Sequence, residues 1–331
     1  MIIYRRPAER DTNAEKIQLD NRALKHIPLL EGEEKIKFLH LQNNEIQKIE
    51  NLVSLPNLHF LDLSNNKLVD ISNIQGVLQL RVLILSKNLI STIQKNNFDS
   101  FKQLDVLDLH DNRISGRLDF SCYLKKLTNL RILNLSGNQI EEVEMTFSMK
   151  SLVELNLRGN KIKNLKIGLN VKGLKEIQFD QLAKIYLSNN QIKDFDSVVT
   201  DKSMLAQVTE LTLENNPIEK DAKLQQKVQE KFPGLSQSSL QKMQTVGLQK
   251  SGERASEQKD SRASTTLKSP RDTSLEPKDA PTGGVGHVVP KSGNTAAKRK
   301  AQENAVIKII QKEWERETER LDFKKNGQYA K

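Results

Sequence analysis

Leucine, isoleucine and valine recur in a fixed order along most of the chain, in the pattern L-x-x-L-x-L-x-x-N-x-L. The pattern occurs eight times, for instance as Leu58, Leu61, Leu63 and Leu68 around Asn66. Successive asparagines are 22 residues apart in the early units and then 24, 26, 22, 30 and 26 apart. The alternation x-L-x-L-x is typical of a short strand with its leucines on one face. The chain is therefore expected to be a stack of similar units.

The asparagine of each unit is expected to turn inward and to bond backbone groups that the turn leaves unpaired. These residues are Asn44, Asn66, Asn88, Asn112, Asn138, Asn160, Asn190 and Asn216. An apolar replacement would leave buried backbone groups without partners, so we assign these asparagines a structural role.

One strand per unit in a regular stack predicts an α/β fold, the leucine-rich-repeat solenoid, with a parallel sheet on the concave face. Short helices or 3₁₀ turns are expected on the convex face, for instance over residues 44–55, where apolar residues recur after the asparagine. Extra residues have to lie outside the strand and the turn. The longer segments 115–129 and 166–181 are thus expected to bulge on the convex side or at an edge.

Shifts in composition divide the chain into six parts. They are an N-terminal arm and cap (1–35), eight repeats (36–219), a helical C-terminal cap (220–246), a disordered linker (247–298), an amphipathic helix (299–323) and a disordered end (324–331). Caps are expected because the end of a stack would otherwise expose leucines to water. The linker is rich in Ser, Thr, Pro, Gly and Lys, so it cannot bury enough apolar surface to fold by itself.

The helix predicted over 299–323 carries an apolar stripe at helical spacing. The stripe consists of Val306, Ile309, Ile310, Trp314 and Leu321. This helix either folds back onto the repeats or docks into a groove of a partner protein. We favour the partner, because Trp314 is the only tryptophan and an aromatic anchor is common in such docking.

The residues that face outward on the predicted strands form the concave surface, where we place a protein-binding site. The candidate residues are Phe38, His40, Phe60, Asp62, Val82, Ile84, Val106, Asp108, His110, Ile132, Asn134, Asn156, Arg158 and Tyr186. The first half is an apolar stripe with a polar rim and the second half is charged, which suits a protein surface. Alternatively, the apolar residues only pack beneath their neighbours.

The stretch LDLHDNRIS at 107–115 brings together Asp108, His110 and Asp111, residue types that occur in metal sites and catalytic dyads. As neighbours two residues apart on one strand, about 7 Å from each other, Asp108 and His110 are expected to be too distant for a dyad. We therefore interpret them as part of the polar rim. The sequence has no phosphate-binding loop, nucleophile elbow or H-E-x-x-H motif, so we expect neither catalysis nor a cofactor or metal.

The formal charge is +10, and residues 248–331 contribute 18 basic and 12 acidic residues. This excess serves solubility or attracts an acidic partner. Aromatic and Arg residues are not interleaved as in a nucleic-acid site, and no apolar run is long enough for a signal peptide or a membrane span. Cys122 is the only cysteine. We therefore expect protein partners in a reducing, cytoplasmic compartment, with neither nucleic acid nor membrane.

Several stretches resemble a known family: IIYRRPAER (2–10), PLLEGEEKIKFLHLQNNEIQKIENL (28–52), LDVLDLHDNRI (104–114), RILNLSGNQI (131–140), ELNLRGNKI (154–162), LSNNQIKDFDSV (187–198) and ENNPI (214–218). They are similar to the family of leucine-rich repeat-containing protein 49, the leucine-rich-repeat subunit of the tubulin polyglutamylase complex. The likeness covers about residues 1–245. PLLEGEE and the N-terminal arm are its specific part.

The resemblance implies a noncatalytic subunit that assembles or targets a tubulin-glutamate ligase at ciliary and centriolar microtubules. Its partners would be the other subunits, including the ligase, and tubulin or microtubules, in the cytoskeleton at a cilium, axoneme or basal body. The lengthened repeats and the tail depart from that family. The 22-residue repeat is also similar to that of phosphatase-1 regulatory subunits and of a leucine-rich axonemal dynein light chain, which remain the alternative.

Overall fold

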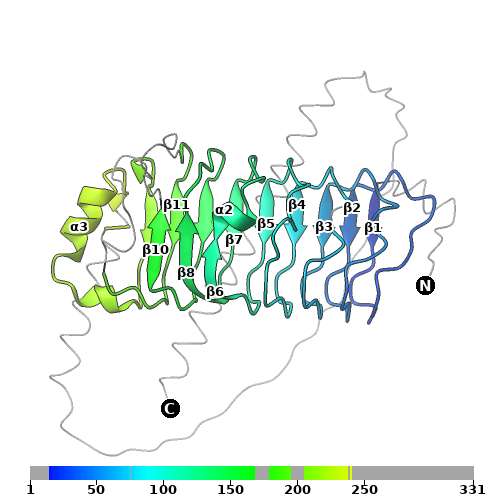
Figure 1. Cartoon of the computed structure of the whole chain (residues 1–331), viewed down its shortest axis with the longest axis horizontal. Coiled ribbons are helices and arrows are strands. Elements are labelled where there is room, and N and C mark those ends of the chain that lie inside the picture. Colours follow the sequence, from blue (N-terminus) through cyan, green and yellow to red (C-terminus); the bar gives the residue numbers. More distant parts are fainter. Residues whose placement is uncertain (1–14, 75, 168–178, 195–204, 238, 241–331) are drawn as a thin grey trace, which may run out of the picture. The chain divides into compact units, whose positions relative to one another are not determined.

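The computed structural model of the chain describes residues 15–74, 76–167, 179–194, 205–237 and 239–240. Its main element is a nine-stranded, fully parallel sheet with one strand per turn of the solenoid (Figure 1). The strands, in their order across the sheet, are β1 (Lys16–Gln18), β2 (Phe38–His40), β3 (Phe60–Asp62), β4 (Val82–Ile84), β5 (Val106–Asp108), β7 (Ile132–Asn134), β9 (Glu154–Asn156), β11 (Lys184–Tyr186) and β12 (Glu210–Thr212). The predicted leucine-rich-repeat solenoid with its parallel sheet is confirmed.

The middle residue of each strand points into one continuous core. These residues are Ile17, Leu39, Leu61, Leu83, Leu107, Leu133, Leu155, Ile185 and Leu211, and each is at most 4% exposed. A side chain of this size contributes about 1.5–3 kcal/mol when it is fully buried. Since every turn adds the same set of apolar positions, the free energy of folding is distributed along the stack.

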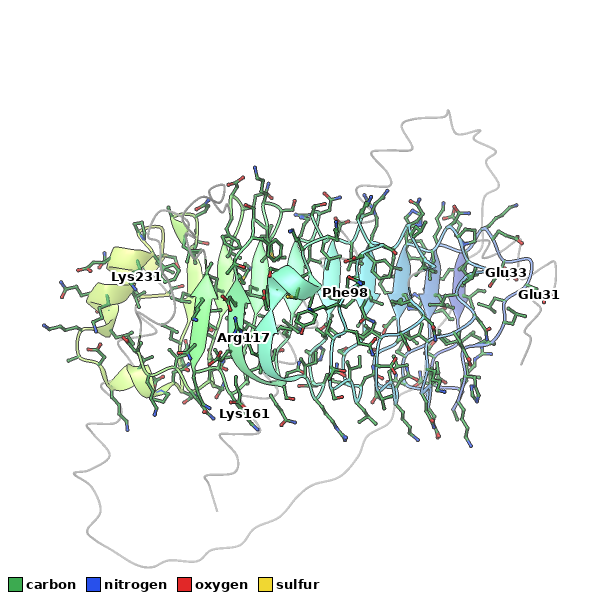
Figure 2. All side chains as sticks on the ribbon, in the orientation of Figure 1. Glu31, Glu33, Phe98, Arg117, Lys161 and Lys231 are labelled. Atoms are coloured by element: carbon green, nitrogen blue, oxygen red, sulfur yellow. The ribbon has the colours of Figure 1, made fainter. Side chains whose placement is uncertain are left out.

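A second sheet, which the sequence reasoning missed, lies in front of the main sheet in the middle of the stack (Figure 1). It consists of β6 (Ser115–Asp119), β8 (Gln139–Met145) and β10 (Asn164–Ile167), parallel and in the order β10-β8-β6. Arg117, which projects from β6 in Figure 2, forms an ion pair with Glu144 of β8. Residues 115–119 of the lengthened segment 115–129 thus form a strand rather than an irregular bulge, and most of the segment 166–181 lies outside the described residues.

Helix is scarce in the described residues. Helix α2 (Phe120–Tyr123) follows β6 directly, and its N-terminus is capped by Asp119, which accepts a hydrogen bond of 2.8 Å from the Ser121 amide. The short helix or 3₁₀ turn expected over 44–55 is wrong, because that segment runs through bends and turns. Ile46, Ile49, Leu52 and Leu55 are buried all the same, whereas Val53 is 77% exposed, since a chain that turns every third residue inward needs no helix.

The last turn is followed by the 3₁₀ helix η2 (Pro217–Lys220) and by α3 (Leu224–Lys231). Leu224 and Val228 of α3 are buried, as is Phe232 just after it. The Ser236 amide donates a hydrogen bond of 3.0 Å to the Thr209 carbonyl, which fastens this segment to the turn that leads into β12. The domain boundaries proposed from the sequence stay a prediction.

None of the helices within the described ranges has the length and apolar character that a membrane crossing requires. The amphipathic helix predicted over 299–323, with Val306, Ile309, Ile310, Trp314 and Leu321, lies outside the described residues. So do the linker and most of the N-terminal arm.

Candidate functional site

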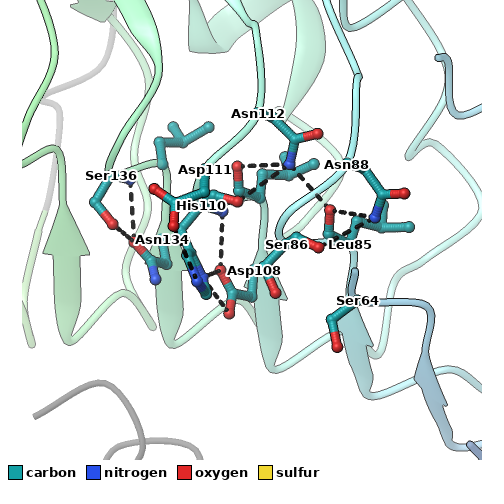
Figure 3. A network of polar contacts seen from close by, with 12 residues as sticks. Ser64, Leu85, Ser86, Asn88, Asp108, His110, Asp111, Asn112, Asn134 and Ser136 are labelled. Carbon is teal, nitrogen blue, oxygen red and sulfur yellow. Dashed lines mark hydrogen bonds and ion pairs between the residues drawn. The ribbon is translucent and has the colours of Figure 1, made fainter. Parts of the chain in front are cut away.

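Eight of the nine turns carry, at the same position after the strand, an asparagine whose side chain joins two neighbouring turns. For Asn112, Nδ2 donates to the Leu85 carbonyl at 2.9 Å and to the Leu109 carbonyl at 3.0 Å, while Oδ1 accepts from the Ile90 amide at 3.1 Å. Asn88 does the same one turn earlier (Figure 3). The eight asparagines, Asn44, Asn66, Asn88, Asn112, Asn138, Asn160, Asn190 and Asn216, are 4–7% exposed. Their amides thus satisfy backbone groups inside the solenoid.

The outer face of the main sheet, opposite the core, carries the residues that the sequence reasoning assigned to protein binding. Strand pairing aligns them in two columns. The first is Phe38, Phe60, Val82, Val106, Ile132, Glu154, Lys184 and Glu210, and the second is His40, Asp62, Ile84, Asp108, Asn134, Asn156, Tyr186 and Thr212. This alignment agrees with the sequence register. The role of these residues in binding is not tested by it and stays a prediction.

The first column begins with an aromatic cluster and continues as an aliphatic stripe. The ring centroids of Phe38 and Phe60 are 6.1 Å apart, and those of His40 and Phe60 are 4.9 Å apart. Val106 is 0% and Ile132 is 2% exposed, yet neither belongs to the core beneath the sheet. The outer face therefore holds a second apolar region, separate from the leucine core.

In the second column, the same hydrogen bond between a side chain and the backbone recurs at the ends of several strands. A side-chain oxygen of Asp62, Asn134 or Asn156 accepts a hydrogen bond from the backbone amide two residues later, at 2.9–3.1 Å. Such a bond between an Asx side chain and the backbone stabilises a turn. These polar residues therefore have a structural role in addition to the binding role proposed for them.

Asp108 and His110 form a close pair, so the expectation that they are too distant for a dyad is wrong (Figure 3). His110 Nδ1 lies 2.9 Å from Asp108 Oδ1 and 3.0 Å from Oδ2. The backbone spacing misleads because both side chains leave the same face of the strand, and the imidazole is long enough to reach back. Asp108 is only 2% exposed, so it is buried rather than part of a polar rim.

The surroundings of the two strand histidines shift their pKa values in opposite directions. Burial alone would lower the pKa of His110, but the charge and hydrogen bond of Asp108, together with Asp111, raise it above its ordinary value. His110 Nε2 lies 3.9 Å from Asp111 Oδ2. Burial and the nearby Lys16 lower the pKa of His40. The protonated form of His110 is thus stabilised by the fold, and that of His40 is not.

We expect the Asp108→Asn substitution to destabilise the protein more in acid than in alkaline solution. Because the pKa of His110 is raised on folding, its pairing with Asp108 is complete below the ordinary histidine pKa and is lost as the pH rises through the raised value. A charged hydrogen bond of this kind contributes about 1.5–3 kcal/mol. Urea unfolding of both proteins on either side of neutrality measures the effect.

An NMR titration of the histidine rings provides the control for this prediction. In the wild-type protein, His110 should titrate at a higher pH than His40, and Asp108→Asn should lower the His110 value while leaving His40 in place. A His110 ring that titrates below His40, or a substitution cost independent of pH, would contradict the prediction.

The second half of the outer face is charged and internally paired. The Arg158 guanidinium carbon lies 5.6 Å from the centre of the Tyr186 ring, a cation–π arrangement. Lys184 Nζ is 3.6 Å from a carboxylate oxygen of Glu154. Burial, followed by the charges of Glu154 and Glu210, raises the pKa of Tyr186. This half therefore carries fixed charges and one aromatic ring whose face is next to Arg158.

A metal site is not apparent among the described residues, which contain no group of three or more His, Cys, Asp or Glu side chains able to hold an ion. The Asp108–His110 pair and Asp111 do not make such a group. In the part of the chain that the structure covers, the side chains of the outer face pack against one another, form hydrogen bonds and carry fixed charges.

Family models match the repeats of this chain. Residues 34–76 and 102–147 match "Leucine Rich repeats (2 copies)", and residues 69–114 match "Leucine rich repeat". Among curated proteins, the chain is similar to tubulin-specific chaperone E of Dictyostelium discoideum, with 33% identity over 119 residues. That match covers 36% of this chain and 19% of the chaperone, so the chain spans about a fifth of that protein's length.

Solved structures of other proteins are similar to this chain. The leucine-rich repeat domain of APL1B has a TM-score of 0.50 and 19% identity, with 65% of this chain and 61% of that chain covered. Internalin C2 of Listeria monocytogenes has a TM-score of 0.47 and 25% identity over 63% of this chain and 83% of that chain. The likeness to the APL1B domain shows the fold alone.

Proposed function

We propose that this leucine-rich-repeat protein is a noncatalytic scaffold that binds other proteins through the outer face of its main sheet. The observation that carries the proposal is the unbroken register of nine strands, which aligns partly exposed side chains, from Phe38 and His40 to Lys184 and Tyr186, on one face. With neighbouring strands about 4.8 Å apart, the face is about 38 Å long. This length accommodates a protein surface or an extended peptide.

The more specific proposal is a subunit of a tubulin polyglutamylase complex. Two observations support it: the resemblance of the N-terminal arm and PLLEGEE to that family, and the partial similarity to a protein named tubulin-specific chaperone E. The partners would be the other subunits, including the ligase, and tubulin or microtubules. The ligase would perform the chemistry, so this chain itself needs no cofactor. Its place would be the cytoplasmic cytoskeleton, at a cilium, axoneme or basal body.

Affinity purification of the tagged full chain, followed by mass spectrometry, tests this function. Recovery of a tubulin ligase-like protein is expected. Recovery of a phosphatase or of a dynein heavy chain instead would favour the alternative, a phosphatase-1 regulatory subunit or a dynein-associated axonemal protein. The isolated chain should show no glutamylation of tubulin with ATP and glutamate.

The same purification tests the role proposed for residues 299–323. If the predicted helix docks on a partner through Trp314, a chain that lacks these residues should lose at least one partner. Retention of every partner would contradict that docking role.

A further inference from the structure

Arg158, just beyond β9 on the outer face, combines partial burial with the lack of a carboxylate partner among the described residues. Of the arginines in the described ranges, only Arg81 and Arg158 are partly buried. Arg81 lies 3.9 Å from a carboxylate oxygen of Asp105, whereas no carboxylate oxygen in that part of the chain lies within 4.0 Å of the Arg158 guanidinium. Water solvates the charge of a fully exposed arginine such as Arg113. The charge of Arg158 is partly withdrawn from water, so it is poorly compensated.

The Tyr186 ring holds the Arg158 guanidinium in place. The guanidinium carbon lies 5.6 Å from the centre of the ring. Arg158 Nε is buried and has no hydrogen-bond partner in the described residues, while the two terminal nitrogens reach the surface. Stacking on a ring fixes the plane of a guanidinium, and a fixed planar fork can donate two parallel hydrogen bonds to a carboxylate. The side chain is therefore preorganised for a ligand of this kind.

Two asparagine amides beside Arg158 supply further donors. Asn134 Oδ1 accepts a hydrogen bond of 3.1 Å from the Ser136 amide (Figure 3). Asn156 Oδ1 accepts one of 3.1 Å from the Arg158 amide, and Asn134 and Asn156 are direct partners in the strand register. Because each oxygen is held by the backbone, each Nδ2 points away from that bond, and neither Nδ2 makes a hydrogen bond within the described ranges. The amides and the guanidinium thus present only donors.

A group of donors with one positive charge favours an acceptor with one negative charge. A carboxylate is such an acceptor, whereas a phosphate monoester carries about −1.5 to −2 at neutral pH and would be neutralised only in part. Acidic side chains of the same half of the face have partners of their own: Glu154 lies 3.6 Å from Lys184, and Glu214 accepts a hydrogen bond of 2.6 Å from Ser188 Oγ. Neither of them pairs with Arg158.

We propose that Arg158, stacked on Tyr186, binds the carboxylate of a glutamate or aspartate side chain of a protein partner. The inference rests on the proposed scaffold function, because the partner supplies the carboxylate. The terminal guanidinium nitrogens donate to the two carboxylate oxygens, and the Asn134 and Asn156 amides donate to carbonyl oxygens of the same segment. Residues of an extended segment are about 3.3 Å apart and neighbouring strands about 4.8 Å, so a short segment spans these donors.

Binding of a fluorescein-labelled hexaglutamate peptide to the full chain, measured by fluorescence anisotropy at low ionic strength, tests the proposal. Arg158→Gln should weaken binding at least about fivefold, because it removes the charge and the fork. Arg158→Lys keeps the charge without the fork, so it should recover only part of the loss. The matched control is Arg113→Gln, the same change of charge at an exposed arginine, which should weaken binding less than about twofold. Circular dichroism establishes that each variant is folded.

Three results would overturn the inference: absence of hexaglutamate binding, equal losses in Arg158→Gln and Arg113→Gln, or tighter binding of a phosphoserine peptide of equal net charge through Arg158. Affinity purification of the wild-type chain separates this inference from the proposed function. If the peptide fails to bind while the wild-type partners are still recovered, the carboxylate site is rejected and the scaffold function is retained.

Discussion

Replacing Asn112 with leucine is expected to lower the free energy of unfolding by about 3–5 kcal/mol. The side chain of Asn112 is 7% exposed, and its amide bonds the Leu85 and Leu109 carbonyls and the Ile90 amide. Leucine has a similar size but neither donates nor accepts, so the Ile90 amide would be buried without its partner. The Leu85 and Leu109 carbonyls would each lose one of two bonds and keep those from Asn88 and Asn138. An unpaired buried amide costs about 1–3 kcal/mol, and each lost hydrogen bond costs about 0.5–1.5 kcal/mol. Urea unfolding followed by circular dichroism measures the change.

Asn129→Leu is the matched control for this prediction, because it is the same substitution at an exposed asparagine. Asn129 makes one hydrogen bond of 2.7 Å, to the Lys102 carbonyl, which water can replace. Its loss should cost less than about 1 kcal/mol. Equal effects at the two positions would show that the buried amide does not carry the energy assigned to it.

Phe101→Ala is expected to destabilise the protein by about 3–5 kcal/mol. Phe101 and Phe98 are both 0% exposed, and their ring centroids are 6.3 Å apart in the core. Removal of the ring loses its burial and leaves a cavity beside Phe98, which the two adjoining turns can close only in part. Chemical denaturation of both proteins under the same conditions measures the difference.

Phe101→Leu serves as the control, since it keeps an apolar side chain at the position. Its cost should be below about 2 kcal/mol, because less volume is lost. If alanine and leucine were equally destabilising, the aromatic ring rather than the filled volume would be the source of the stability.

The main sheet could be predicted because the leucine and asparagine positions fix the register of each turn independently of its length. Leu107 and Asn112 hold their places although the preceding spacing is 24 residues rather than 22. The inward leucine fits only the apolar core, and the asparagine amide fits only where backbone groups need hydrogen-bond partners. A change in spacing is therefore absorbed elsewhere in the turn.

The second sheet could not be predicted in the same way. Strand β8 has Ile140, Val143 and Met145 buried, an alternation interrupted between Ile140 and Val143, and β6 and β10 are short. Their pairing depends on how three segments from repeats of different length come together, and such contacts leave little trace in local pattern. The wrong helix over 44–55 has a related cause. Apolar residues at every third position fit a 3₁₀ helix and a bent chain equally well.

The sequence predicts which residues of the candidate site lie next to one another on neighbouring strands. It does not predict which side chains form hydrogen bonds. The columns from Phe38 to Glu210 follow from the repeat, whereas the pairing of Asp108 with His110 depends on side-chain length and rotamer.

The three-stranded sheet of β6, β8 and β10 also bears on local unfolding. Each of these repeats contributes one strand to the main sheet and one to the three-stranded sheet. Local unfolding of such a repeat therefore has to break hydrogen bonds in both sheets. Opening of the terminal repeats breaks contacts with one neighbour only. Amide hydrogens of Val143 and Leu165 should therefore exchange with deuterium later than those of the end turns, which makes the middle of the stack the last part to open.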